Sequence, residues 1–333
     1  MKVNIFTEAE MLKLRTTGIV TSYRGLKRAL EEEGVEVAVN EKKGYDILHV
    51  HSFGPISLVR MIPEKKPVVV TTHTVPDEMG LLYRGGVYVQ GLFEKYLGFV
   101  YSQADLLISP SLFAKERVQR MGVKSRIMVE SNGIHTEKFS RSLEKRKQMR
   151  DSLGFSDDDF VVGCVGLPSK RKGLDVFVEV AKRLPELRFM WVGENIYGRL
   201  LKDYGYLEWL KKNLPENVVL TGYVDDIQAA YSSMDLFLFP TMIETEGLVV
   251  LEAACCGLPL VTSRVRGLSW LNEGEHCLKA ESVEEYVEVV RLLMKDDVER
   301  KRLTSNAKKL AEEKDIRRVV KRIIGLYEEL LNG

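Results

Sequence analysis

The sequence is poor in the features that mark secreted, membrane-spanning and nucleic-acid-binding proteins. Its 333 residues include four cysteines, two of them adjacent and none in a Cys-x-x-Cys pair, so neither a disulfide framework nor a zinc site is indicated. No apolar run reaches the roughly 18 residues that a transmembrane helix needs, and the N-terminus turns acidic too early for a signal peptide. The net charge of +1 provides no global field for nucleic acid. We therefore expect a cytoplasmic protein whose anion sites are local.

Two further features that the sequence lacks or has little of bear on the function and source of the protein. The loop after the first predicted strand, Leu14–Gly18, does not read Gly-x-Gly-x-x-Gly, which counts against a dinucleotide-dependent oxidoreductase. Gly18 stays a candidate contact, because a glycine lets the backbone approach a ligand closely. Glutamine is sparse while Lys, Arg and Glu are abundant, a bias typical of thermophilic proteins.

Short apolar runs alternate with helix-period segments along most of the chain. Val3–Phe6 precedes a helical pattern at Ile19–Glu33, and the alternation pauses at the charged stretch Phe139–Asp159 before restarting at Val161–Val165. Strands alternating with helices indicate parallel sheets covered on both faces. We predict an α/β protein of two tandem doubly wound, Rossmann-like domains facing a cleft, residues 1–150 and 151–315, with the charged stretch as their connection.

The most informative segment is PTMIETEGLVVLEAACCGLP, Pro240–Pro259. An apolar strand precedes it, and the pattern predicts a helix over Gly247–Cys256. The unpaired N–H groups at the start of such a helix suit a phosphate. Glu252, inside the helix, could accept hydrogen bonds from a sugar diol. This arrangement fits a nucleotide-sugar, although a cap and a salt bridge would also explain Glu244 and Glu252.

A basic loop follows the strand Val161–Val165. It reads Gly166-Leu-Pro-Ser-Lys170-Arg171-Lys172-Gly173, three cations between two glycines before a helix. A flexible loop of this kind can bring cations to a diphosphate, and Lys172 lies next to the helix start. The alternative is a solvated turn. The position after a strand, together with Glu244 and Glu252, favours the clamp.

Three other acidic or histidine patterns could suggest metal or hydrolytic sites. If Glu244 and Glu252 shared a helix they would lie ~12 Å apart, too far for the carboxylate pair of a glycoside hydrolase. The run Asp157-Asp158-Asp159 is read as a turn. His49 and His51 lack an acidic third ligand nearby, so we predict no metal site. We expect His49 to be a buried, hydrogen-bonded histidine, while His73, in a polar loop, is a candidate contact.

Taken together these residues resemble the retaining glycosyltransferases of family 4 (GT4), which have the GT-B fold. The likeness runs over nearly the whole chain. It is carried by Glu244 to Glu252 before CCGLP, by VESNGIHTEKF at Val129–Phe139, and by TGYVDDIQAAYSSMDLFLFP at 221–240. ADLLISPS at Ala104–Ser111 is similar to the segment that precedes the domain boundary.

The resemblance implies roles for individual residues. Glu252 would hold the ribose hydroxyls, Glu244 would contact the donor sugar, and Lys172 would bind the diphosphate. His73 would lie near the transferring sugar. The remaining residues implied in donor binding are Gly18, Gly166, Lys170, Arg171, Tyr223, Val224, Gly247, Leu248 and Val249. The resemblance also implies that the last helix, about 316–333, packs back on the first domain.

Two positions depart from the family's pattern. Leu167 stands where an arginine is usual after the glycine, so the diphosphate clamp lacks one cation, and Lys170 or Arg171 would have to substitute. His135 stands where aspartate is common, and no consequence follows from the sequence.

The resemblance therefore implies a hexosyltransferase that uses a UDP-, GDP- or ADP-sugar, retains the anomeric configuration and needs no metal or other cofactor. A nucleotide-sugar 2-epimerase and a catalytically silent nucleotide-sugar binder remain as alternatives. The loop Thr71–Gly86 is similar to that of lipid-glycosylating members. A basic segment, Leu112–Arg126, could rest on an anionic membrane surface, or could simply pack its apolar side on the sheet. The first of these would place the protein peripherally on the cytoplasmic face of a membrane.

Overall fold

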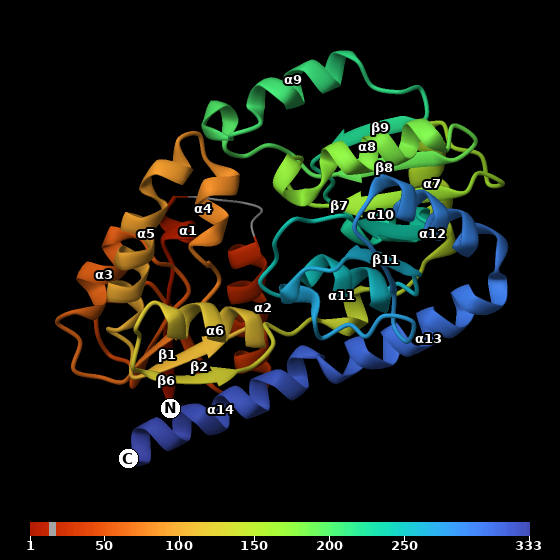
Figure 1. Cartoon of the computed structure of the whole chain (residues 1–333). Helices are drawn as coiled ribbons and strands as arrows, with labels where there is room; N and C mark the ends of the chain where they lie inside the picture. The colour runs from red at the N-terminus through yellow and green to blue at the C-terminus, as the bar shows by residue number, and fades with distance from the viewer. Residues whose placement is uncertain (13–17) are drawn as a thin grey trace. The chain divides into compact units, whose positions relative to one another are not determined.

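The computed structural model describes residues 1–12 and 18–333 and divides into two compact units, each built on its own sheet (Figure 1). Residues 1–79, 87–135 and 314–333 form unit 1. Residues 80–86 and 136–313 form unit 2. Both sheets are six-stranded and every strand pair is parallel, which confirms the predicted doubly wound α/β class.

Unit 1 has the strand order β2-β1-β3-β4-β5-β6. Its strands are short and its central ones are buried along their whole length, as apolar runs such as VVVT require. The strands are β1 Lys2–Phe6, β2 Glu36–Val39, β3 Ile47–Val50, β4 Val68–Thr71, β5 Leu106–Ser109 and β6 Arg126–Val129. The helices are α1 Glu8–Met11, α2 Gly18–Glu32, α3 Pro55–Met61, α4 Asp77–Leu82 (whose last residues group with unit 2), α5 Gly86–Tyr101, α6 Leu112–Arg120 and α14 Ile316–Asn332.

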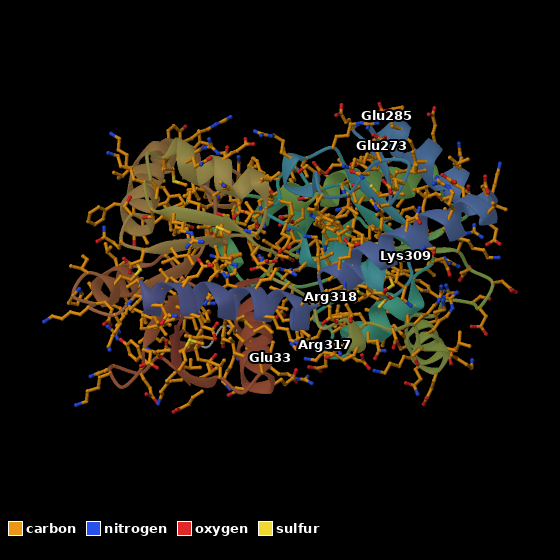
Figure 2. All side chains as sticks on the ribbon, turned by 90° about the horizontal axis from the view of Figure 1, so that it is seen from below. Glu33, Glu273, Glu285, Lys309, Arg317 and Arg318 are labelled. Atoms are coloured by element: carbon orange, nitrogen blue, oxygen red, sulfur yellow. The ribbon has the colours of Figure 1, made fainter. Side chains whose placement is uncertain are left out.

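The last helix, α14, belongs to unit 1 although it ends the chain. One side of it, including Val319, Ile323 and Tyr327, is buried in the same core as the inner side of α2. Lys321 pairs with Glu33 across 3.6 Å (Nζ to Oε1), and Figure 2 shows Glu33 beside this helix. Burial of a long apolar stripe, rather than helix propensity, therefore holds α14 in place.

Unit 2 has the strand order β12-β11-β10-β7-β8-β9. Aromatic side chains from β8 and β10, including the fully buried Trp191 and Phe237, fill its core. The strands are β7 Val161–Val165, β8 Arg188–Val192, β9 Val218–Gly222, β10 Leu236–Phe239, β11 Leu260–Ser263 and β12 Leu278–Ala280. The helices are α7 Leu143–Leu153, α8 Leu174–Arg183, α9 Tyr204–Lys212, α10 Ile227–Ser233, α11 Leu248–Cys255, α12 Val283–Lys295 and α13 Asp297–Glu313, with 3₁₀ turns η1 Thr136–Lys138, η2 Lys170–Lys172, η3 Gly198–Leu200 and η4 Arg266–Leu268.

The charged stretch Phe139–Asp159, expected as a connection, is not an unstructured linker: it contains α7, which packs on α10. Arg150 of α7 is fully buried, and its Nη2 donates to Oδ2 of Asp235 at 2.5 Å. Its Nη1 donates to the carbonyls of Ser156, Asp157 and Asp159, which confirms the Asp157–Asp159 run as a turn. The charges that suggested a connection between domains are thus partly internal, because a buried guanidinium needs several acceptors.

Candidate nucleotide-sugar site

The candidate site lies where the strand order of unit 2 reverses. Strand β7 lies between β8 and β10, so the chain leaves β7 and β10 toward opposite sides of the sheet. Ligands of open parallel sheets bind beyond the carboxyl ends of the strands at such a switch point. The loops that follow these two strands, residues 166–173 and 240–247, are the two segments that the sequence singled out.

The basic loop after β7 is a capped turn rather than the flexible loop that we expected. Lys170–Lys172 form one turn of 3₁₀ helix, and the Ser169 hydroxyl accepts from the Lys172 N–H at 3.4 Å. The carbonyl of Arg171 accepts from the N–H of Met242 at 2.8 Å, which joins this turn to the loop after β10. The turn therefore presents its cations from a fixed backbone.

Lys172 and Glu244 meet at the junction of the two loops. Nζ of Lys172 hydrogen-bonds to Oε2 of Glu244 and lies 5.1 Å from the ring centroid of Phe239. Burial alone would raise the pKa of Glu244, but the charges of Lys172 and Arg171, with hydrogen bonds from Lys172 and the Thr245 N–H, bring it below its ordinary value. Glu244 is therefore ionised at neutral pH although its side chain is 10% exposed.

Helix α11 begins at Leu248, with Gly247 as its cap in the left-handed region at a φ of +82°. A Cβ on Gly247 would come within 2.8 Å of Cδ2 of Leu268, so both the conformation and the space require glycine. The N–H groups of Leu248 and Val249, at the start of the helix, have no partner within the helix itself and suit an anion. The predicted helix over 247–256 is confirmed within one residue at each end.

Glu244 precedes α11, so the helical spacing of ~12 Å that we used to set it apart from Glu252 was wrong. The two glutamates differ instead in the side chains that they contact. Glu244 is held by Lys172, whereas Oε2 of Glu252 accepts from the hydroxyl of Tyr231 at 2.6 Å. Burial raises the pKa of Glu252 to about 7, and the hydrogen bond from Tyr231 opposes that rise.

Tyr231 belongs to the candidate site through its bond to Glu252, and the sequence did not predict it. It lies on α10, inside the segment 221–240 that carried part of the resemblance, and it is fully buried. A tyrosine in a helix reads as an ordinary core residue. Its sequence separation from Glu252 gives no signal that the two side chains touch.

The other residues predicted to bind the donor lie outside the junction of Lys172 and Glu244. Lys170 is exposed, with Nζ 4.7 Å from the ring centroid of Tyr206. The N–H of Gly166 donates to the Val192 carbonyl at 2.9 Å and is therefore used within the sheet. Tyr223 and Val224 follow the end of β9, with Tyr223 49% exposed.

Unit 1 carries the predicted histidines and Gly18. His49 is confirmed as a buried, paired histidine: Nδ1 lies 2.6 Å from the Tyr327 hydroxyl and Nε2 lies 2.8 Å from Oγ1 of Thr71. His73 is half-buried after β4, and its Nε2 lies 3.0 Å from Nδ1 of His51. Gly18 is the exposed first residue of α2, and residues 14–17 of its predicted loop lie outside the described residues.

Two family models match this chain: "Glycosyltransferase Family 4" over residues 19–138 and "Glycosyl transferases group 1" over residues 145–310. The second match contains both loops of the candidate site. The chain belongs to glycosyltransferase family 4. It is therefore a glycosyltransferase, as the resemblance predicted.

The relatives of this glycosyltransferase include enzymes named for lipid acceptors. It is 29% identical to the processive diacylglycerol alpha-glucosyltransferase of Acholeplasma laidlawii, over 99% of each chain. It is 25% identical to the alpha-galactosylglucosyldiacylglycerol synthase of Streptococcus pneumoniae, over 78% of this chain and 72% of that one.

Solved structures with the GT-B fold also resemble the chain. Anabaena HepE, solved in complex with UDP-glucose, superposes with a TM-score of 0.83 at 17% identity, over 99% of this chain and 100% of that one. The sucrose-phosphate synthase of Thermosynechococcus elongatus gives a TM-score of 0.84 at 17% identity, over 100% and 99%. At this identity the likeness shows the fold alone.

Proposed function

We propose that this glycosyltransferase moves a hexose from a nucleotide-sugar to a lipid hydroxyl, with retention at the anomeric carbon and without a metal ion. The part of this proposal that concerns the nucleotide-sugar donor is supported by one observation. Lys172, Glu244 and the start of α11 meet at the switch point of unit 2. A cation and unpaired N–H groups beside a buried, ionised carboxylate suit a diphosphate next to a sugar.

In this proposal Lys172 stabilises the leaving diphosphate. An ammonium has three N–H donors, so Lys172 can keep its bond to Glu244 and donate another to the diphosphate. The bond between the anomeric carbon and the diphosphate oxygen breaks as the acceptor oxygen bonds to the same face of that carbon. The acceptor's proton passes to the departing diphosphate oxygen. Lys172, the Leu248 and Val249 amides and, nearby, Lys170 and Arg171 supply the positive charge that a metal ion would otherwise provide.

Glu252 would hold the ribose in this proposal. Its free carboxylate oxygen can accept hydrogen bonds from vicinal hydroxyls while Tyr231 donates to the other. The nucleobase would then extend past Tyr223 and Val224, beyond β9. We test a uridine diphosphate donor first, since HepE, which shares the fold, was solved with UDP-glucose. The diphosphate contacts do not depend on the base.

A lipid acceptor is supported by the relatives and by one surface of unit 1. Both relatives described above are named for glycosylated diacylglycerols. The start of α3 lies against the middle of α5, since Tyr96 donates to the Phe53 carbonyl at 2.8 Å and the rings of Phe53 and Phe93 are 5.8 Å apart. These helices carry a set of exposed apolar side chains, which we call the α3–α5 face: Ile56, Val59, Ile62, Val87, Tyr88, Val89, Leu92 and Phe99.

The α3–α5 face replaces the basic segment Leu112–Arg126 as the membrane contact in this proposal. Helix α6 ends at Arg120, and its apolar residues Ala114 and Val118 are buried in the core. Arg117 pairs with Asp77 at 2.7 Å. None of the helices in the described part of the chain is long and apolar enough to cross a bilayer, so contact would be interfacial.

The test is a transfer reaction with UDP-glucose and vesicles of dioleoylglycerol with phosphatidylglycerol, in EDTA. We expect a glucosyl-diacylglycerol with an α-linkage, measured by mass spectrometry and by the anomeric coupling constant in NMR. A β-linked product would contradict retention, and product only after divalent metal is restored would contradict the metal-free step. Interconversion of nucleotide-sugars without acceptor would support the epimerase, and binding of UDP without any turnover would support the silent binder.

A further inference from the structure

Two imidazole rings in unit 1 are hydrogen-bonded to each other. His51 directly follows β3 and His73 comes two residues after β4, and these strands are neighbours in the sheet. Nδ1 of His51 lies 3.0 Å from Nε2 of His73. His51 is 1% exposed, whereas His73 is half-buried and reaches the surface of the unit. Only one hydrogen can lie between the two nitrogens, so the bond fixes how both rings are protonated.

The second nitrogen of His51 decides the direction of this bond. Nε2 of His51 is buried and has no hydrogen-bond partner among the described residues. If His73 donated, that nitrogen would carry a hydrogen with nothing to accept it. If His51 donates from Nδ1, Nε2 is a bare acceptor. Buried N–H groups without a partner are rarer than unsatisfied acceptors, so the second arrangement is favoured.

We infer that His51 is a positioning residue that holds His73 in the tautomer with its hydrogen on Nδ1. This inference rests on the proposed function and on the family resemblance, which implies that His73 lies near the transferring sugar. His73 then presents an N–H donor to its ligand, while its only acceptor nitrogen is occupied by His51. It can bind a hydroxyl oxygen of the sugar, but it cannot take the acceptor's proton.

The surroundings keep all three rings of the group neutral. His49 packs against His51 with ring centroids 4.3 Å apart, and it is itself fixed by Tyr327 and Thr71. Tyr23 meets His51 edge-on at 6.4 Å between centroids. No carboxylate in the described part of the chain hydrogen-bonds to any of these imidazoles. Burial lowers the pKa of His73 to about 4, so the ring stays neutral at physiological pH and the tautomer alone sets its chemistry.

The direct test is ¹⁵N NMR of the full chain labelled at histidine, at pH 7 and without ligand. We expect Nδ1 of His73 to give the shift of a protonated nitrogen and Nε2 that of an unprotonated one. Signals are assigned from the spectra of His73→Gln and His51→Asn. A hydrogen on Nε2 of His73 in the wild type overturns the inference, whatever the activity. The correct tautomer in a chain that transfers no sugar would leave the inference standing and contradict the proposed function.

A matched pair of variants tests whether His51 acts through this bond. The amide nitrogen of His51→Asn lies about where Nδ1 was, whereas that of His51→Gln lies nearer Nε2. We expect Asn to preserve the His73 tautomer and most of kcat. Gln should give a mixture of tautomers and lower kcat by about tenfold or more, with KM less affected. Equal losses in both variants, with the tautomer unchanged, would reduce His51 to a packing residue. If the Gln variant does not fold, the wild-type spectrum still decides.

Discussion

The two units place opposite kinds of polar group at the carboxyl ends of their sheets. In unit 2 the group is charged: Lys172 pairs with Glu244, and Glu252 accepts a hydrogen bond from Tyr231. In unit 1 the group consists of imidazoles, His49, His51 and His73, that burial keeps neutral. The same doubly wound architecture therefore carries charged side chains in one unit and neutral hydrogen-bonding rings in the other. The side chains after each strand, and not the fold, decide which chemistry a switch point performs.

The largest expected effect tests the charged group of unit 2. Lys172→Ala should lower kcat by two to three decades, since about 3–4 kcal/mol of charge stabilisation on the leaving diphosphate is lost. Initial rates with saturating UDP-glucose measure this effect. Lys182→Ala is the matched control, because Lys182 pairs with Glu179 on the exposed side of α8. A rise in KM with kcat unchanged would contradict a transition-state role for Lys172.

The second prediction concerns Glu252. Glu252→Ala should weaken UDP binding by about 1.5–3 kcal/mol, as expected for hydrogen bonds to a charged group. In the wild type, burial raises the pKa of Glu252 to about 7, so binding should strengthen as the pH rises through 7 and weaken below it. Calorimetric titration with UDP between pH 5.5 and 8.5 measures both effects.

Tyr231→Phe tests whether Glu252 sets the pH dependence of UDP binding. The variant removes the hydrogen bond that opposes the rise in the pKa of Glu252, so the midpoint of the binding curve should move to higher pH. An unchanged midpoint would mean that another group sets the pH dependence.

The third prediction tests the α3–α5 face of unit 1. The double variant Val59→Ser, Leu92→Ser should lower partition into phosphatidylglycerol vesicles by about tenfold, because apolar area no longer enters the interface. Vesicle flotation measures the partition. Val298→Ser, at a position 79% exposed in unit 2, is the matched control. Equal partition of the double variant and the wild type would exclude this face as the membrane contact.

The last prediction separates the two groups by the pH dependence of stability. Burial lowers the pKa of His49 to about 3 and that of His73 to about 4. Between pH 6.5 and 4 the unfolded chain therefore binds protons that the folded one does not. Each histidine should then lower the free energy of unfolding by about 1.4 kcal/mol for every pH unit of acidification. Glu252 has the opposite sign: its raised pKa means that the folded state gains stability as the pH falls from 7 toward 4.3.

Urea unfolding at pH 5 and pH 7 measures the balance of these contributions. His49→Gln should flatten the loss of stability in acid, whereas Glu252→Gln should steepen it. If the loss of stability in acid changed in the same direction in both variants, the histidines of unit 1 and Glu252 of unit 2 would not have opposite effects on stability.

Much of the fold could be predicted because its signals are local. The buried strands are short apolar runs, and α2 and α11 lie within one residue of their predicted ends. Helix α7 was missed because its sequence, LEKRKQMRDSL, carries charges that pair with distant residues such as Asp235. Periodicity reads only neighbours on one helix, so it cannot distinguish a solvated charge from one that the fold buries.

The sequence by itself determined the class of the protein, and it singled out the two loops of the candidate site with the residues Lys172, Glu244 and Glu252. It could do so because strand, glycine and helix start are contiguous there, and contiguous residues cannot separate in space. Only the tertiary structure decided that Tyr231 supports Glu252, that His51 bonds to His73, and that Tyr327 near the end of the chain fixes His49. These contacts join segments far apart in the chain. Their side-chain geometry follows from the packing of whole sheets and helices, which no short pattern encodes.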